Sequence, residues 1–171
     1  MGTRFNHSAG RAWQNASVLV NCYDERGRFP AVVPDEVQGG ATATRLLLEA
    51  GHRRIAFVND AAPSPASVGR LAGYKAALAQ FDVDFDPSLV LSVTADQEGG
   101  YGAAAQVLAT GATGVFCHND RTALGLYDAL RESGKRVPDD ISVVGFDNQE
   151  VISAHMHPAL TPLAFLSTIS A

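Results

Sequence analysis

Apolar and polar positions follow one another along the chain in two alternating patterns, and together these patterns predict an α/β fold. Short, nearly continuous apolar runs are typical of strands in a sheet that is covered on both faces. Apolar residues three or four positions apart indicate amphipathic helices between those strands. The expected strands are 54–59, 89–93, 113–117 and 141–146, and the expected helices are 35–50, 66–80, 96–108 and 120–133. This alternation predicts a three-layer, doubly wound parallel sheet with right-handed crossovers and helices on both faces.

The apolar residues of each expected helix also indicate which of its sides faces the sheet. In the first helix the inward positions are expected to be Val37, Ala41, Thr44 and Leu48, and in the third they are Tyr101, Ala104, Ala105 and Leu108. Gly39 and Gly40 weaken the first helix, so these glycines are expected to permit close packing of its backbone against a neighbour.

The two ends of the chain do not follow this rhythm of strands and helices. Residues 17–21 and 31–33 form short strand candidates, the second of which is expected to stop at Pro34. We interpret residues 1–16 as an irregular or expression-derived tail, and 35–153 as the main lobe. The segments 17–34 and 154–171 are then crossover segments that connect this lobe to a partner lobe, most of which lies outside the chain.

Composition narrows the classes of function. The 171 residues are 46% hydrophobic and 18% charged, with a net charge of -5, so the chain has no general attraction for nucleic acid or anionic membranes. No apolar run is as long as a membrane span. Only two cysteines, Cys22 and Cys117, are present, which predicts no disulfide framework and favours a reducing, cytoplasmic location.

Motifs for catalysis and for cofactor binding are absent. The sequence contains no G-x-G-x-x-G after a strand, no G-x-x-x-x-G-K-[ST] loop and no G-x-S-x-G elbow. Ser64 and Ser67 follow a strand but are expected to be turn formers or caps. His118 has no partner that the sequence identifies. The pair His155 and His157 lacks a third ligand, so two surface histidines are favoured over a metal site. We therefore expect neither an enzyme nor a resident metal or cofactor.

Three polar residues are expected to meet at the carboxyl edge of the parallel sheet, where open α/β folds bind ligands. Arg70 lies in the helix after strand 54–59, Asn119 follows strand 113–117, and Asp147 follows strand 141–146. A guanidinium, an amide and a carboxylate suit a polyhydroxylated ligand. Singly, each has a structural alternative: Arg70 can pair with a surface acid, Asn119 can cap a helix, and Asp147 can shape a turn. Together at one edge they favour a binding site.

Four strings in this sequence resemble those of LacI/GalR-type transcriptional repressors, in the same order and with matching spacing. They are His52-Arg53-Arg54-Ile55-Ala56-Phe57, Arg70-Leu71-Ala72-Gly73-Tyr74, Asn119-Asp120-Arg121-Thr122-Ala123-Leu124-Gly125, and residues 137–148, Val-Pro-Asp-Asp-Ile-Ser-Val-Val-Gly-Phe-Asp-Asn. The string Pro158-Ala159-Leu160-Thr161 resembles the family's following Pro-x-Leu-Thr. The resemblance covers about 18–163.

The resemblance implies an effector domain like the type I periplasmic binding proteins, built of two Rossmann-like α/β lobes. A small molecule, usually a sugar or a nucleobase-type metabolite, binds between the lobes. Its binding changes the setting of N-terminal helix-turn-helix DNA heads in a homodimer. By this resemblance the chain corresponds to the C-terminal lobe. Arg70, Asn119 and Asp147 match positions that contact the effector in the family.

The chain also departs from the family pattern. The family's DNA-binding head and most of its first lobe are expected to lie outside this chain, so DNA would be reached only through that head. Ala95 occupies a position where the family often has an aromatic ring for stacking on the ligand. The resulting hypothesis is a cytoplasmic, sugar-sensing module of a transcriptional regulator, without membrane contact. The alternatives are a solute-binding protein of a sugar transporter, which shares the fold, and a small α/β enzyme.

Overall fold

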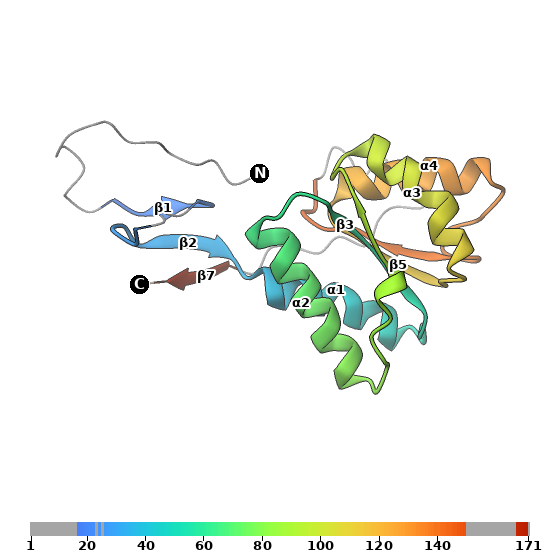
Figure 1. Cartoon of the computed structure of the whole chain (residues 1–171), viewed down its shortest axis with the longest axis horizontal. Coiled ribbons are helices and arrows are strands. Elements are labelled where there is room, and N and C mark those ends of the chain that lie inside the picture. The colour runs from blue at the N-terminus through green and yellow to red at the C-terminus, as the bar shows by residue number, and fades with distance from the viewer. Residues whose placement is uncertain (1–16, 23, 25, 150–166, 171) are drawn as a thin grey trace. The chain divides into compact units, whose positions relative to one another are not determined.

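A computed structural model of the chain describes residues 17–22, 24, 26–149 and 167–170, the last four by their backbone (Figure 1). The expected tail at 1–16, the histidine pair 155/157 and the string 158–161 lie outside the described residues. The chain divides into two compact units, one formed by Met1–Asp35 with Phe165–Ala171 and the other by Glu36–Ala164. No helix in the described part of the chain is long and apolar enough to cross a membrane.

The smaller unit contains a three-stranded sheet. Strand β1 (Leu19–Val20) pairs in parallel with β2 (Ala31–Pro34), which pairs antiparallel with β7 (Ser167–Ser170). The prediction that Pro34 stops β2 is wrong by one residue, because Pro34 is its last residue and lies opposite Ser167. Strand β1 pairs only with Ala31 and Val32 of β2. The missing N–H of Pro34 therefore removes no hydrogen bond between β1 and β2.

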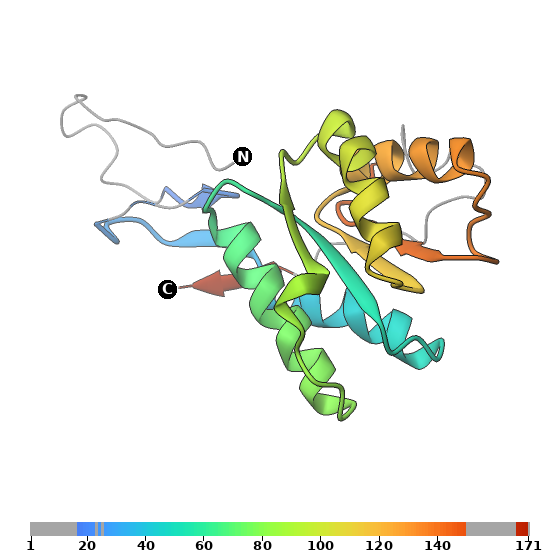
Figure 2. The ribbon, with the colours of Figure 1, turned by 45° about the vertical axis from the view of Figure 1, so that its right-hand side comes forward.

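The larger unit confirms the predicted parallel sheet. Its strand order is β4-β3-β5-β6, and all its pairings are parallel. The strands are β3 (Ile55–Asp60), β4 (Val90–Val93), β5 (Gly114–Cys117) and β6 (Ser142–Val144). The helices are α1 (Glu36–Glu49), α2 (Pro65–Gln80), α3 (Gln97–Ala109) and α4 (Asp120–Glu132), with a 3-10 turn at Pro87–Leu89. Helices α1 and α2 cover one face and α3 and α4 the other (Figures 1 and 2).

The two faces of this sheet are packed with different kinds of side chain. On the α1/α2 face, Phe57 stacks on Phe116 with ring centroids 4.5 Å apart, and Tyr74 and Phe146 extend the aromatic cluster. On the α3/α4 face the buried side chains are small or aliphatic, among them Val58, Leu91, Val115, Leu126 and Leu130. Successive residues of β3 and β5 point to opposite faces, as the two-residue period of a strand requires.

Glycines set the distance between the paired helices. A Cβ atom on Gly40 of α1 would overlap the backbone of Arg70 in α2, and one on Gly73 of α2 would overlap the Val37 carbonyl of α1. On the other face, a Cβ on Gly125 of α4 would overlap the Gln97 carbonyl of α3. The expectation that Gly40 permits close packing is therefore confirmed.

The glycines also change which sides of α1 and α3 face inward. Val37 is 47% exposed, Tyr101 is 46% exposed and Ala105 is also exposed, although all three were expected to face inward. The inward stripes instead run through glycine, with Gly39, Gly40, Ala43, Thr44, Leu47 and Leu48 buried in α1 and Gly100, Ala103, Ala104 and Val107 buried in α3. Close contact through glycine turns the bulkier neighbouring side chain outward.

Candidate functional site

Arg70 lies at the centre of the charged groups near the carboxyl edge of the sheet and is only 4% exposed. Its Nε donates to Glu36 Oε2 at 2.7 Å, and Nη1 donates to the backbone carbonyl of His118. Its Nη2 lies 3.6 Å from Asp147 Oδ1, and the guanidinium carbon lies 3.7 Å from the centre of the Phe146 ring. The acids that pair with Arg70 are mostly buried, so it is not a surface ion pair.

The start of α2 fixes the position from which Arg70 extends. Ser64 caps the helix by accepting from Ser67 N, and the Ser67 hydroxyl accepts from Ser64 N at 2.9 Å. Pro65 occupies the first turn, where a missing N–H has no cost. The expectation that Ser64 and Ser67 act as caps is therefore confirmed, and neither is left as an isolated nucleophile.

Asp147 lies three residues after the end of β6, in an unusual backbone conformation. Its φ is 101° and that of Asn148 is 52°, both in the left-handed region that favours glycine. Burial raises the pKa of the Asp147 carboxyl, while the positive charge of Arg70 lowers it. Non-glycine residues with positive φ cost free energy and are concentrated at functional sites. Asp147 thus combines a strained backbone with a half-buried carboxylate beside Arg70.

Asn119 performs the structural role that the sequence left open, because it caps α4. Its Oδ1 accepts from Thr122 N at 2.9 Å and from Thr122 Oγ1 at 3.0 Å, and its Nδ2 donates to the Ala95 carbonyl at 3.1 Å. Within the described part of the chain it forms no hydrogen bond to Arg70 or Asp147. The structure therefore brings Arg70 and Asp147 together and places Asn119 at the end of the adjacent strand. Its contact with a ligand remains a prediction.

His118 belongs to a buried network that the sequence did not reveal. Its Nδ1 lies 3.0 Å from Oδ1 of Asn59, whose Nδ2 donates to the Ser67 carbonyl at 3.0 Å. Burial and the nearby charge of Arg70 lower the pKa of His118 to about 4, against an opposing effect of Asp60. The side chain is therefore neutral at pH 7.

Asp120 joins the segment that follows β6 to the first turn of α4. Its backbone N–H donates to the Phe146 carbonyl at 2.9 Å, and its Oδ2 accepts from Gln149 N at 2.6 Å. Burial raises the pKa of this carboxyl, since the residue is 1% exposed. Asp120 therefore helps to hold the segment that carries Asp147.

Sequence reasoning missed Glu36, and it could not find a partner for His118. Glu36 precedes Arg70 by 34 residues and Asn59 precedes His118 by 59, and no motif joins either pair. The one clue to the contact between Asn59 and His118 is the strand order, because β3 and β5 are neighbours and their carboxyl ends lie at the same edge of the sheet.

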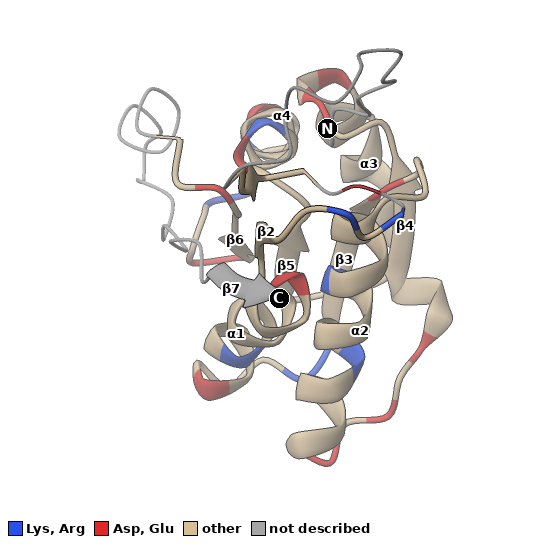
Figure 3. Cartoon of the chain, turned by 90° about the vertical axis from the view of Figure 1, so that its left-hand side faces the viewer, with Lys and Arg blue, Asp and Glu red and all other residues tan. Residues whose placement is uncertain are grey.

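The described groups around Arg70 supply hydrogen-bond donors and acceptors at the carboxyl edge of the sheet. One guanidinium faces the carboxylates of Glu36 and Asp147, and the imidazole of His118 contacts an amide rather than a nucleophile. Among the described residues, no cluster of three or more His, Cys, Asp or Glu is arranged to hold a metal ion. Along the ribbon in Figure 3, positions of Lys and Arg (blue) are interspersed with positions of Asp and Glu (red).

Comparisons with known proteins identify the family. Residues 44–166 match the family described as periplasmic binding protein-like domain. The HTH-type transcriptional repressor PurR of Vibrio atlanticus is 34% identical over 146 residues, which are 84% of this chain and 43% of that protein. The HTH-type transcriptional regulator CelR of Thermobifida fusca is 37% identical over 129 residues, 74% of this chain and 38% of that protein.

Solved structures agree with this assignment. A LacI family transcriptional regulator from Enterococcus faecium with bound ribose has a TM-score of 0.80 at 36% identity, covering 86% of this chain and 55% of that one. A complex of the regulator CelR with cellobiose has a TM-score of 0.74 at 29% identity, covering 86% and 53%. The chain therefore belongs to the periplasmic binding protein-like domain family, as an effector-binding domain of the LacI/GalR type. It spans less than half the length of those two curated relatives.

Proposed function

We propose that this chain senses a sugar as the C-terminal lobe of the effector-binding domain of a transcriptional regulator. The observation that carries the proposal is the buried guanidinium of Arg70, held by Glu36 and by the His118 carbonyl beside the carboxylate of Asp147. Carboxylates accept from hydroxyl groups and a guanidinium donates to them, so this set suits a polyol better than an anion.

Family membership supports the same assignment. Arg70, Asn119 and Asp147 match positions that contact the effector in LacI/GalR-type regulators, and related structures contain ribose or cellobiose. We propose that all three residues line one wall of the site. On this proposal, residues 35–153 form the C-terminal lobe, and 17–34 and 154–171 are the crossover segments.

The remaining partners follow from the family and are proposals for this chain. DNA would be bound through a helix-turn-helix head outside the chain, by a homodimer in the cytoplasm. A solute-binding protein of a sugar transporter would share the fold, but the curated relatives described above are named as transcriptional regulators, which favours regulation.

The test is an NMR titration of the isotope-labelled 171-residue chain with D-ribose, cellobiose and hypoxanthine in separate experiments. This method detects weak binding, and it reports the position of the site as well as the affinity. We expect one of the sugars to shift the signals of Arg70, Asn119 and Asp147 together. Saturation by hypoxanthine alone would replace a sugar with a nucleobase. Shifts elsewhere, or none with any compound, would refute the proposed site.

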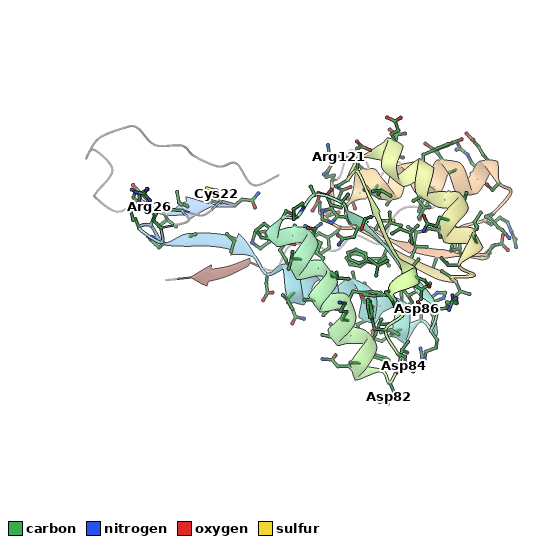
Figure 4. The ribbon with its side chains drawn as sticks, in the orientation of Figure 1. Cys22, Arg26, Asp82, Asp84, Asp86 and Arg121 are labelled. Carbon is green, nitrogen blue, oxygen red and sulfur yellow. The ribbon has the colours of Figure 1, made fainter. Side chains whose placement is uncertain are left out.

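A matched pair of variants separates the site from general effects of charge. Asp147→Asn should weaken sugar binding by roughly 2–4 kcal/mol, because a charged hydrogen-bond partner is lost from a mostly buried site. Asp84→Asn removes an exposed carboxylate and should leave the affinity unchanged. Figure 4 labels Asp84 at the end of the larger unit opposite Arg121, the second residue of α4.

A further inference from the structure

His118 follows the last residue of β5 at the carboxyl edge of the sheet. Phe116 packs in the α1/α2 core and Cys117 in the α3/α4 core, so His118 is again on the α1/α2 side. Its backbone carbonyl accepts from Nη1 of Arg70. His118 is therefore part of the group that holds Arg70 in place, and its imidazole belongs to the same end of the sheet.

The hydrogen bonds of Asn59 determine which ring nitrogen of His118 carries a hydrogen. The Nδ2 of Asn59 donates to the Ser67 carbonyl at 3.0 Å, and its Oδ1 accepts from Asp60 N at 2.9 Å, which fixes the orientation of the amide. The atom that faces His118 Nδ1 at 3.0 Å is thus an oxygen. Since an oxygen without hydrogens can only accept, Nδ1 must be the donor.

The other ring nitrogen, Nε2, is then a hydrogen-bond acceptor. The imidazole is neutral because burial and Arg70 lower its pKa to about 4, against the opposing charge of Asp60. A neutral imidazole with its hydrogen on Nδ1 carries a lone pair on Nε2. The ring therefore shows neighbouring molecules an acceptor at pH 7, and it would show them a donor only if it were protonated.

Nε2 of His118 is not fully buried, although the residue is only 6% exposed. The described residues contain no side-chain nitrogen or oxygen that is both fully buried and without a hydrogen bond. Within that part of the chain Nε2 forms no hydrogen bond, so it must retain some exposure. A surface groove of about 360 Å³ along α2 is lined by Asn59, Ser67, Val68, Lys75 and their neighbours but not by His118. The accessible atom therefore belongs to the sheet edge and not to that groove.

We propose that Nε2 of His118 is a specificity-determining acceptor of the effector site, which selects ligands that present a hydroxyl hydrogen beside Arg70. The inference rests on the proposed function and deepens it. Arg70 offers only donors, and Asp147 offers only acceptor oxygens when ionised. His118 adds a neutral acceptor, which discriminates between a hydroxyl group and an ether or deoxy position without attracting cations.

Two variants separate the roles of the two ring nitrogens. In His118→Asn the amide nitrogen can still donate to Asn59 Oδ1, but no acceptor remains at the position of Nε2. In His118→Gln the longer side chain can offer its carbonyl oxygen near that position. The ligand series is D-ribose or cellobiose, whichever binds the wild-type chain, together with monodeoxy analogues of that sugar. Affinities are measured by NMR titration, and the ¹⁵N shifts of the ring report which nitrogen carries the hydrogen.

We expect the free wild-type chain to show hydrogen on Nδ1 and not on Nε2. His118→Asn should lose about tenfold in sugar affinity, as for one net hydrogen bond, and His118→Gln should recover most of it. One deoxy analogue should bind the wild-type chain about tenfold more weakly than the parent sugar does. The His118→Asn variant should bind this analogue and the parent sugar with equal affinity. This loss of discrimination would not follow from a structural role alone.

The outcomes distinguish this inference from the proposed function. If the wild-type chain binds a sugar at Arg70 and Asp147 while His118→Asn binds it equally tightly, the role of His118 is refuted and the proposed function stands. A hydrogen on Nε2 in the free protein would also refute it. If the wild-type chain binds no sugar, the proposed function fails and the inference fails with it.

Discussion

The two faces of the main sheet differ in composition and in what they contribute to its carboxyl edge. The α1/α2 face has an aromatic core of Phe57, Tyr74, Phe116 and Phe146, and Arg70 stacks on the last of these rings. The buried side chains of the α3/α4 face are aliphatic and small, and its two helices begin at the carboxyl edge with the capping residues Asp96 and Asn119. The charged part of the candidate site is therefore a continuation of one core and not of both.

This difference assigns separate roles to the residues that the sequence grouped together. Arg70 and Asp147 meet over the aromatic face, where ring stacking and burial hold a guanidinium in a fixed position. Asn119 serves the other face, where its side chain completes the start of α4. Residues at the same sheet edge can thus be fixed by different cores, and changes to one core should affect the site more than changes to the other.

The largest expected effect tests whether the aromatic face dominates stability. Phe116→Ala should lower the free energy of unfolding by about 4 kcal/mol, since a fully buried ring that stacks on Phe57 is lost. Val115→Ala, next to it on β5 but on the aliphatic face, should cost about 2 kcal/mol. Denaturant unfolding followed by circular dichroism measures both. Equal losses would remove the energetic distinction between the faces.

The pH dependence of stability tests the buried imidazole on the aromatic side. The folded pKa of His118 is about 4, below its ordinary value of 6.5, so the unfolded chain binds more protons between these values. The neutral ring therefore contributes about 3 kcal/mol to the free energy of unfolding above pH 6.5. This contribution is lost as the pH falls from 6.5 to 4. The raised pKa values of Asp120 and Asp147 act in the opposite direction.

Comparison with a variant separates the effect of His118 on stability from the effects of Asp120 and Asp147. His118→Asn does not titrate, so the difference in unfolding free energy between it and the wild type should change across this pH range. Parallel curves from pH 7 to pH 4 would show that the ring is not held neutral. Urea unfolding at several pH values provides the measurement.

Loss of the central cation should have a smaller effect on stability. Arg70→Met leaves Glu36 and Asp147 without their shared partner, and their side chains are 15% and 21% exposed, so partial solvation limits the cost to about 2 kcal/mol at pH 7. The defect should shrink in acid as the carboxyls become protonated. Arg131→Met, which removes an exposed pair with Asp128, should change the unfolding free energy by less than about 0.5 kcal/mol. A defect that is independent of pH would contradict the ion-pair explanation.

The smallest expected effect concerns Asn119 and the aliphatic face. Asn119→Ala should cost about 1 kcal/mol through loss of the helix cap. Asn119→Asp keeps an oxygen for Thr122 and should restore most of this loss, although it cannot donate to the Ala95 carbonyl. If Asn119→Asp is stable yet binds sugar more weakly, the amide also contacts the ligand, as we propose. Thermal unfolding and NMR titration together separate the two roles.

The sequence predicted the order of elements well because their periodicity is local. Strand and helix positions agree with the structure to within a few residues, and the shared edge of a parallel sheet correctly brought Arg70 near Asp147. The inward faces of α1 and α3 were misjudged because hydrophobicity ranks Val37 and Tyr101 above glycine, whereas close helix packing requires glycine.

The parts that the sequence did not predict depend on contacts between distant residues. Glu36 reaches Arg70 across the paired helices α1 and α2, and Asn59 reaches His118 across neighbouring strands. Neither contact has a spacing rule, because each depends on how two separate elements pack. For Asn119 the sequence left two roles open, a helix cap and a ligand contact, because an amide at the start of a helix suits both.

The close helix contacts at glycine also limit which mutations the gene can tolerate. Every single-nucleotide change that replaces a glycine introduces a residue with a Cβ atom or a stop codon. At Gly40, Gly73 and Gly125 such an atom would overlap the backbone of the adjoining helix. No replacement at these three sites is conservative. Selection should therefore remove substitutions there more strongly than substitutions at the exposed ends of the same helices. Because Gly40 lies against the backbone of Arg70, that purifying pressure also protects the position of the guanidinium.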